Sequence, residues 1–311
     1  MGRRGQTGLS GVIVVDKPAG MTSHDVVSRV RRLTGEGRVG HAGTLDPMAT
    51  GVLVVLIGPA TRLAPLLTAE DKSYQARVVF GAETDTDDAE GEVTRTAPVD
   101  PALADRAVAA ERVSALLGQH EQVPPDYSAI KVEGKTAYRA ARAGEALDLA
   151  SRTVSIRDAQ LIRVEAGPPV TWDIVLAVSK GTYVRALARD LGRDTGTAAH
   201  LGALRRTASG AFTLQHAVAL DALEADPHAL ARSFVDPIVG LGLPVIALTP
   251  EIGSRIAVGA ALPATSEPGT LAEATRVAIA DEGALHAIYR RSGDTLVADI
   301  VFPVPVTRVP R

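Results

Sequence analysis

The sequence of 311 residues contains no cysteine. This absence excludes disulfide bonds, thiolate-bound metals and a cysteine nucleophile. The seven histidines show neither the H-x-x-x-H nor the H-E-x-x-H spacing that is typical of zinc sites. We therefore expect no bound metal, and no motif in the chain indicates a cofactor.

Long apolar runs are also missing. The longest extends from about Gly51 to Gly58, far short of the roughly 20 residues that a membrane-spanning helix needs. Near the N-terminus only four consecutive apolar residues occur, Val12 to Val15, too few for the core of a signal peptide. We therefore expect a cytoplasmic protein that has no membrane partner.

Lysine is scarce, with 5 residues against 28 arginines, and asparagine is absent. A genome rich in G and C favours arginine codons over lysine codons, so the remaining lysines are candidates for sites that need a compact ammonium group. These candidates are Lys17, Lys72, Lys131, Lys135 and Lys180.

The formal net charge of −3 argues weakly against a nucleic-acid partner, but the charge is unevenly distributed. Residues 1–62 carry a net charge of +4 and residues 131–193 also carry +4, whereas residues 81–111 carry −7 and residues 219–311 carry −4. Because the field at a site depends on local charge, a polyanionic partner remains compatible with this sequence.

Hydrophobic patterning predicts a main domain of the α+β class. Strands are expected at 12–15, 52–57, 74–80, 154–164 and 172–179. Helices are expected from Ser23, as the capping residue, to Gly35, and at 101–117, 136–143 and 184–191, the last ending at Gly192, with further helical patterns near 217–234. Residues 83–92 are acidic and expected to be exposed. Beyond Pro237, short strands at 245–248, 276–280, 285–289 and 296–302 predict a small, mostly β domain.

Two glycine motifs do not predict nucleotide binding. Gly35 to Gly40 matches G-x-G-x-x-G, but it follows a predicted helix instead of a strand. Gly134-Lys135-Thr136 resembles the end of a phosphate loop, but alanine occupies the position of the required first glycine.

The segment from Gly40 to Gly51 is chemically unusual. Asp46 precedes a proline, which favours an extended backbone that presents the carboxylate away from the loop. Glycines at positions 40, 43 and 51 permit close approach of a ligand or of another backbone. Local chemistry leaves two interpretations open, an ordinary Asp-Pro turn or a reactive carboxylate.

Seven stretches, in order over residues 11–207, resemble the bacterial tRNA pseudouridine synthase B family. They are residues 11–23 (GVIVVDKPAGMTS), 40–51 (GHAGTLDPMATG), 71–74 (DKSY), 81–87 (GAETDTD), 123–131 (VPPDYSAIK), 179–185 (SKGTYVR) and 204–207 (LRRT). The resemblance implies a pseudouridine synthase fold, with a central mixed, mainly antiparallel sheet flanked by helices. It also implies a domain organisation: a flexible N-terminus at 1–10, a catalytic domain at 11–238 with a thumb-like RNA-contacting insertion at 120–150, and a PUA-like, mostly β C-terminal domain at 239–311.

The function that this resemblance implies is isomerisation of the uridine at position 55, in the T loop of tRNA, to pseudouridine. The reaction would proceed by base flipping, with Asp46 as nucleophile and without a cofactor. Tyr74 and Arg185 match the family's other catalytic positions, and Arg185 is expected to pair with Asp46. Residues implied in substrate or RNA binding are Lys17, Pro18, His41, Gly43, Thr44, Lys131, Lys180, Tyr183 and Leu204.

The resemblance leaves other interpretations open. The chain could act on the T arm chiefly as a tRNA-folding chaperone, with catalysis secondary. A guide-RNA-dependent relative is disfavoured because lysine-rich terminal extensions are missing and because the segment 131–149 is typical of stand-alone bacterial enzymes. We therefore expect binding of the T-arm stem-loop without a guide RNA, and we separately expect a monomer. The C-terminal segment, in which Arg255, Arg290 and Arg291 are the main basic candidates, could contact RNA or serve as a structural cap.

Overall fold

The computed structural model describes residues 7–132, 134–145, 147–226, 228–264 and 272–308. The chain divides into two compact units. The first unit contains residues 1–70 and 208–311, and the second is the continuous segment 71–207. Residues 1–6 of the predicted flexible N-terminus lie outside the described residues. Residues 7–10 are held by hydrogen bonds, among them one from the Thr7 amide to Glu36 (2.9 Å) and one from Thr307 N to Ser10 O (3.1 Å).

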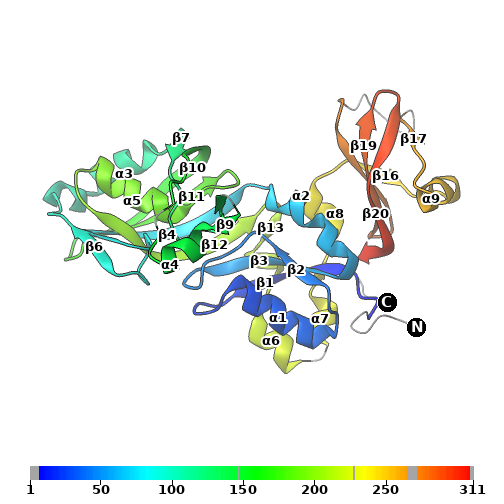
Figure 1. The fold of residues 1–311 in the computed structure, drawn as a ribbon, viewed down its shortest axis with the longest axis horizontal. Helices are drawn as coiled ribbons and strands as arrows, with labels where there is room; N and C mark the ends of the chain where they lie inside the picture. Colours follow the sequence, from blue (N-terminus) through cyan, green and yellow to red (C-terminus); the bar gives the residue numbers. More distant parts are fainter. Residues whose placement is uncertain (1–6, 133, 146, 227, 265–271, 309–311) are drawn as a thin grey trace. The chain divides into compact units, whose positions relative to one another are not determined.

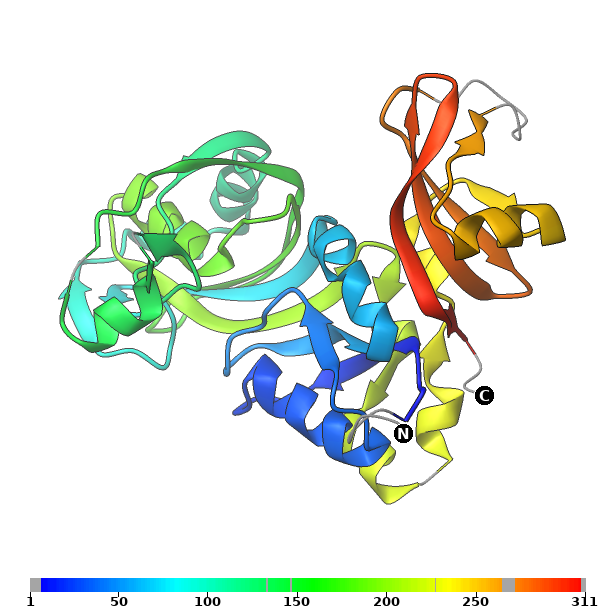
Figure 2. The ribbon, with the colours of Figure 1, turned by 45° about the vertical axis from the view of Figure 1, so that its right-hand side comes forward.

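The first unit begins with a strand, a helix and a hairpin, and it ends with a small β domain (Figures 1 and 2). Its N-terminal elements are β1 (Gly11–Lys17), α1 (Ser23–Thr34), β2 (Val39–Ala42), β3 (Thr50–Ile57), η1 (Gly58–Leu63) and α2 (Ala64–Thr68). After the second unit follow β13 (Phe212–Thr213), η3 (Leu214–His216), β14 (Ala217–Ala219), α6 (Leu220–Ala225), α7 (Ala229–Arg232), β15 (Phe234–Val235) and α8 (Pro237–Leu241). The β domain comprises β16 (Val245–Ala247), α9 (Pro250–Ala257), β17 (Leu262–Pro263), β18 (Arg276–Asp281), β19 (Ala284–Ser292) and β20 (Thr295–Thr307).

Strand β1 is the centre of the sheet in this unit. It pairs antiparallel with β3 and β15 and parallel with β14, so the sheet is mixed. All seven residues of β3 from Gly51 to Ile57 are buried, which accounts for the uninterrupted apolar run in the sequence. Helices α1 and α6 contact each other beside this sheet (Figure 1).

The C-terminal β domain shares a hydrophobic core with the N-terminal elements of its unit. Its five strands are ordered β16-β18-β19-β20-β17. Ala278, Leu285 and Phe302 from this domain belong to the same buried cluster as Val12 and Leu56. The predicted strands of this segment are confirmed, whereas α9 was not predicted from the sequence.

The second unit is built on long antiparallel strands. The strand order is β12-β4-β11-β10-β7, and β4, β11, β10 and β7 pair antiparallel. The strands are β4 (Lys72–Phe80), β5 (Ala82–Thr84), β6 (Val93–Thr96), β7 (Gly118–Gln122), β8 (Lys131–Val132), β9 (Lys135–Thr136), β10 (Arg152–Glu165), β11 (Thr171–Val178) and β12 (Ala199–Ser209). The helices are η2 (Pro101–Ala104), α3 (Arg106–Ser114), α4 (Ala137–Arg142) and α5 (Val184–Asp194).

Three local predictions about helices are wrong. Helix α1 is capped by Thr22 in a capping box with Asp25, while the Ser23 side chain is buried. The expected helix at 101–117 is divided at Asp105, which ends η2 and caps α3. Helix α5 does not end at Gly192 but continues to Asp194.

The prediction that residues 83–92 are exposed is also wrong in part. Glu83, Asp87 and Asp88 are buried, and each is paired with arginine. The acidic stretch forms a turn closed by hydrogen bonds from Asp85 N to Glu92 O (3.0 Å) and from Thr84 Oγ1 to Asp88 O (2.6 Å).

Candidate active site

The loop that carries Asp46 connects β2 and β3, which pair in register from Val39 with Ile57 to Ala42 with Val54. The buried Ser23 hydroxyl fixes this loop, since it donates to Leu45 O (3.0 Å) and accepts from Leu45 N (2.8 Å). The amide of Ala49 donates to Asp46 O (3.1 Å). Asp46 itself is half-buried, and these hydrogen bonds hold the backbone on both sides of it.

A fully buried lysine donates hydrogen bonds to the same loop and to the chain after β1. Lys17 Nζ donates to Pro18 O (2.9 Å), to Met21 O (2.6 Å) and to Pro47 O (3.2 Å), and its side chain has 0% exposure. A buried ammonium is costly unless several acceptors surround it, and these carbonyls supply that environment. The end of β1 is thereby joined to the residue that follows Asp46.

The other candidates of the first unit lie on the same hairpin or beside it. His41 lies on β2 opposite Val55 and is half-buried. Gly43 has φ +92°, a left-handed conformation that favours glycine. Thr44 and Pro18 are exposed. The structure thus brings Lys17, Pro18, His41, Gly43, Thr44 and Asp46 together around one hairpin connection.

The remaining candidates belong to the second unit. Tyr74 lies on β4 opposite Leu176 of β11 and is 8% exposed. It shares the buried face of β4 with Ala76 and Val78. Leu204, on the neighbouring strand β12, is also buried. Lys180 is exposed in the turn between β11 and α5.

Arg185 lies in the first turn of α5 and is only 4% exposed. Its Nη1 donates to Thr86 O (2.8 Å) and its Nη2 donates to Tyr127 O (2.9 Å). Its Nε lies 3.7 Å from the Asp88 carboxylate. Two separate segments, the acidic turn and the chain after β7, therefore orient this guanidinium.

Tyr183 caps α5 and is held at both its backbone and its ring. The Gln122 carboxamide accepts from Tyr183 N (2.8 Å) and donates to Tyr183 O (3.1 Å). The Arg152 guanidinium lies over the tyrosine ring, 5.7 Å from its centroid. Sequence reasoning missed Gln122 and Arg152, because neither belongs to a pattern that marks a side chain as part of a site.

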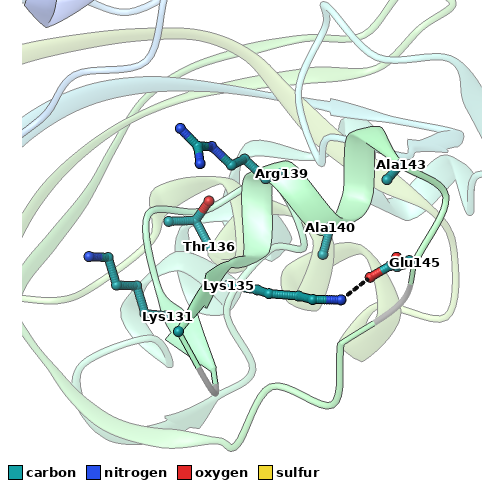
Figure 3. Close-up of a pocket in the computed structure, with 8 residues that line it drawn as sticks. Lys131, Lys135, Thr136, Arg139, Ala140, Ala143 and Glu145 are labelled. Carbon is teal, nitrogen blue, oxygen red and sulfur yellow. Dashed lines mark hydrogen bonds and ion pairs between the residues drawn. The ribbon is translucent and has the colours of Figure 1, made fainter.

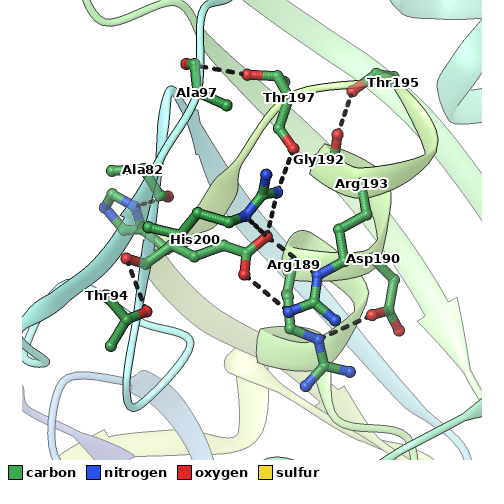
Figure 4. Close-up of polar contacts among 12 residues, drawn as sticks. Ala82, Thr94, Ala97, Arg189, Asp190, Gly192, Arg193, Thr195, Thr197 and His200 are labelled. Carbon is green, nitrogen blue, oxygen red and sulfur yellow. Dashed lines mark hydrogen bonds and ion pairs between the residues drawn. The ribbon is translucent and has the colours of Figure 1, made fainter.

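Arginines from α5 also neutralise the buried acids of the turn, and Figure 4 shows Arg189 and Arg193 on this helix. Arg189 pairs with Asp87 at 2.8 Å, and Arg193 and Arg95 both bind Glu83. Hydrogen bonds from Arg193 and Arg95 lower the pKa of Glu83 to about 2. Burial raises the pKa of Asp87 to about 6, although Arg189 opposes the shift.

A basic hollow of about 450 Å³ lies in the segment expected to act as a thumb (Figure 3). Lys131, Lys135 and Arg139 line it, from the β8–β9 hairpin and from α4. Lys135 pairs with Glu145 (3.0 Å), and Lys131 is exposed. Glu145 also lines the hollow, so three cationic side chains and one acidic side chain surround a space that suits a polyanion. The role of Lys131 in RNA binding stays a prediction.

In the described parts of the chain, no group of three or more His, Cys, Asp or Glu side chains could hold a metal ion. No helix among them is long and apolar enough to cross a membrane.

Comparison with known proteins gives consistent matches. A model described as the N-terminal domain of TruB family pseudouridylate synthase matches residues 31–184, and one described as the tRNA pseudouridylate synthase B C-terminal domain matches residues 185–238. A protein of Thermobifida fusca is 52% identical over 70% of this chain and 75% of its own length, and one of Nocardia farcinica is 47% identical over 88% and 90%. Both are named tRNA pseudouridine synthase B.

A solved structure confirms the predicted fold class. The chain resembles a protein in the crystal structure of a Cbf5-Nop10-Gar1 complex, with a TM-score of 0.66 and 24% identity over 97% of this chain and 85% of that one. At this identity the likeness shows a shared fold, and with the mixed, mainly antiparallel pairing described above it supports the expected architecture.

Proposed function

The chain belongs to the TruB family of pseudouridylate synthases, and from this premise we propose that it converts the uridine at position 55 of the tRNA T loop to pseudouridine. Relatives named tRNA pseudouridine synthase B, similar over most of their length, support tRNA as the substrate. The observation that carries the proposal is the Asp46 loop, in which a fully buried lysine and a buried serine hold the backbone around a half-buried carboxylate.

The reaction is an isomerisation that needs no external reactant. The N1–C1′ bond of uridine breaks, the base turns, a C5–C1′ bond forms, and the proton on C5 is finally replaced by one on N1. Ionised Asp46 is the nucleophile of this scheme. Attack on C1′, addition to C6 and a glycal intermediate all require the same carboxylate.

The residues of the second unit take supporting roles in this scheme. Arg185 is proposed to pair with Asp46, because a guanidinium keeps a carboxylate ionised where water is excluded. The Tyr74 ring stacks on the flipped base, and its phenol takes part in proton transfer. Tyr183 and Leu204 line the base pocket.

Binding of the T arm is assigned to the hairpin of the first unit and to basic residues of the second. His41 enters the T loop, where it stacks in place of the flipped base, and Gly43 and Thr44 allow the RNA to approach closely. Lys131 and Lys180 contact phosphates, and the basic hollow around Lys131 supports this role. Lys17 and Pro18 form the wall beside the nucleophile.

The domain organisation that we propose is the one that the family resemblance implies. Residues 11–238 form the catalytic domain, 120–150 the RNA-contacting insertion, and 239–311 a PUA-like domain. The protein is proposed to act as a cytoplasmic monomer on tRNA alone, without guide RNA.

The test is mass-shift mapping of pseudouridine in tRNA and in a T-arm stem-loop, without guide RNA. The wild type is expected to modify position 55 in both, and Asp46→Asn is expected to bind the RNA but to form no product. Asp221→Asn, the same chemical change at an exposed side chain (93% exposure), is the matched control and should retain activity. Normal product from Asp46→Asn would refute the assignment of the nucleophile.

A further inference from the structure

Two arginines, one turn apart on α5, bridge the same two segments of the second unit. Arg185 donates to Thr86 O in the acidic turn and to Tyr127 O in the chain after β7. Arg189 donates to the Asp87 carboxylate in the first segment (2.8 Å) and to Val123 O in the second (2.9 Å). The bridges therefore run in parallel, and the carbonyls that orient Arg185 lie on segments that Arg189 also holds.

We propose that Arg189 is a positioning residue for the reaction, and that it acts through the acidic turn and residues 123–127 to orient the guanidinium of Arg185. The inference rests on the proposed function, in which Arg185 pairs with the nucleophile. Arg189 needs no contact with substrate in this role.

The Asp87–Arg189 ion pair is largely buried, and its guanidinium is held at several atoms. The side chains of Arg189 and Asp87 are 11% and 10% exposed, so water competes little for the pair. The Nε of Arg189 is held by Asp190 (2.9 Å), which leaves its two Nη groups aimed at different segments. A planar guanidinium can span two acceptors in this way, whereas an ammonium cannot keep the same fork.

The backbone at Asp87 adds a second reason. Its φ is +60°, an uncommon conformation for a residue with a Cβ, and such a conformation persists only where surrounding contacts enforce it. Asp87 N donates to Thr84 O (3.2 Å) and Leu201 N donates to Asp87 O (3.0 Å), so Arg189 completes a set of contacts around this residue. Loss of Arg189 should loosen the turn at Thr86, the residue that accepts from Arg185.

Arg193 provides a matched control on the same helix. It lies one further turn along α5 and binds the buried Glu83 carboxylate through two hydrogen bonds (3.0 and 2.8 Å). Glu83 is on β5 and is also held by Arg95. The change Arg193→Gln therefore removes an arginine and an ion pair of similar kind without removing the bridge to residues 123–127.

The experiment compares Arg189→Gln, Arg189→Lys and Arg193→Gln in the full chain. Hydrogen exchange is measured in residues 84–90 and 122–128, together with the single-turnover rate on a T-arm stem-loop and the Kd for that RNA. For Arg189→Gln we expect faster exchange in both segments, a rate lower by about 10-fold or more and an unchanged Kd, because misplacement of an orienting group affects the chemical step. Arg189→Lys keeps the charge but loses the forked geometry, so its exchange and its rate should lie between those of the wild type and those of Arg189→Gln. Arg193→Gln should match the wild type in exchange at 122–128 and in rate.

The outcomes separate the two proposals. Wild-type exchange in Arg189→Gln, or faster exchange with a wild-type rate, overturns the positioning role. If Arg189→Gln does not fold, hydrogen exchange and the single-turnover rate of Arg189→Lys decide by the same criteria. A wild type that forms no pseudouridine overturns the proposed function instead, and the exchange data then still decide whether Arg189 holds the two segments.

Discussion

The buried carboxylate of Glu83 provides a quantitative test of the electrostatics in the second unit. It accepts from Arg95 Nη2 (2.6 Å) and Nε (3.1 Å), and from Arg193 Nε (3.0 Å) and Nη2 (2.8 Å). The change Glu83→Gln keeps the shape but replaces one acceptor oxygen with an NH₂ group that must face a guanidinium. We expect this substitution to lower the free energy of unfolding.

The size of the effect follows from the pKa. The two arginines lower the pKa of Glu83 from 4.5 to about 2, and a difference of one unit corresponds to about 1.4 kcal/mol. The ionised carboxylate therefore contributes up to about 3 kcal/mol at pH 7, reduced by solvent screening because the guanidiniums are half-exposed. Since the folded pKa is depressed, this contribution is complete above pH 4.5 and declines as the pH falls, to about 1 kcal/mol at pH 3.

The assay is urea unfolding of wild type and Glu83→Gln at pH 7, 5 and 3. The difference in unfolding free energy should be largest at pH 7, almost as large at pH 5, and reduced at pH 3. A Gln variant as stable as the wild type at pH 7 would refute the reasoning. A difference that does not shrink between pH 5 and pH 3 would show that ionisation of Glu83 is not its source.

Substitutions at four further positions test other contacts. Because burial raises the pKa of Asp87 from 3.8 to about 6, the wild type should gain about 2 kcal/mol of unfolding free energy relative to Asp87→Asn as the pH falls from 6 to 4, measured by urea unfolding. Lys17→Met should reduce the single-turnover rate by about 100-fold, because three loop carbonyls lose their donor; a wild-type rate would contradict this. Gln122→Ala should lower the free energy of unfolding by about 1–3 kcal/mol, since the Tyr183 amide loses its acceptor. Gln122→Glu keeps an acceptor oxygen and should therefore lose less stability than Gln122→Ala. Lys131→Ala should make the slope of log K against log salt shallower by about 0.7–0.9 in RNA titrations, and an unchanged slope would exclude a phosphate contact.

The strands were predicted well because their signal is local. The buried run in β3 and the alternation along β4 are visible in the sequence, and the structure places both strands within two residues of the expected bounds. Helix ends were predicted less well. Gly192 suggested a helix stop, but a Cβ there would lie 2.5 Å from Ala199 N, so this glycine permits close packing within a continuing helix.

The burial of the acidic turn could not be predicted from the sequence. A stretch with many carboxylates is usually solvated. The α5 arginines that neutralise Asp87 and Glu83, Arg189 and Arg193, lie about a hundred residues further along the chain. The same holds for Gln122, whose partner Tyr183 is 61 residues away. Motif resemblance indicated the candidate residues, but only the fold shows which backbone groups hold them.

The way the chain divides between the two units has a consequence for how it folds. The second unit is one continuous segment, 71–207, so it can fold as soon as that segment has been synthesised. The sheet of the first unit cannot, because Val14 of β1 pairs with Ala217, which is made 203 residues later. Until β14 and β15 emerge, β1 has an unpaired, strongly apolar edge that invites association with other chains. Resistance to protease should therefore appear first in the middle of the chain during translation, and shortened chains that end before Phe234 should aggregate.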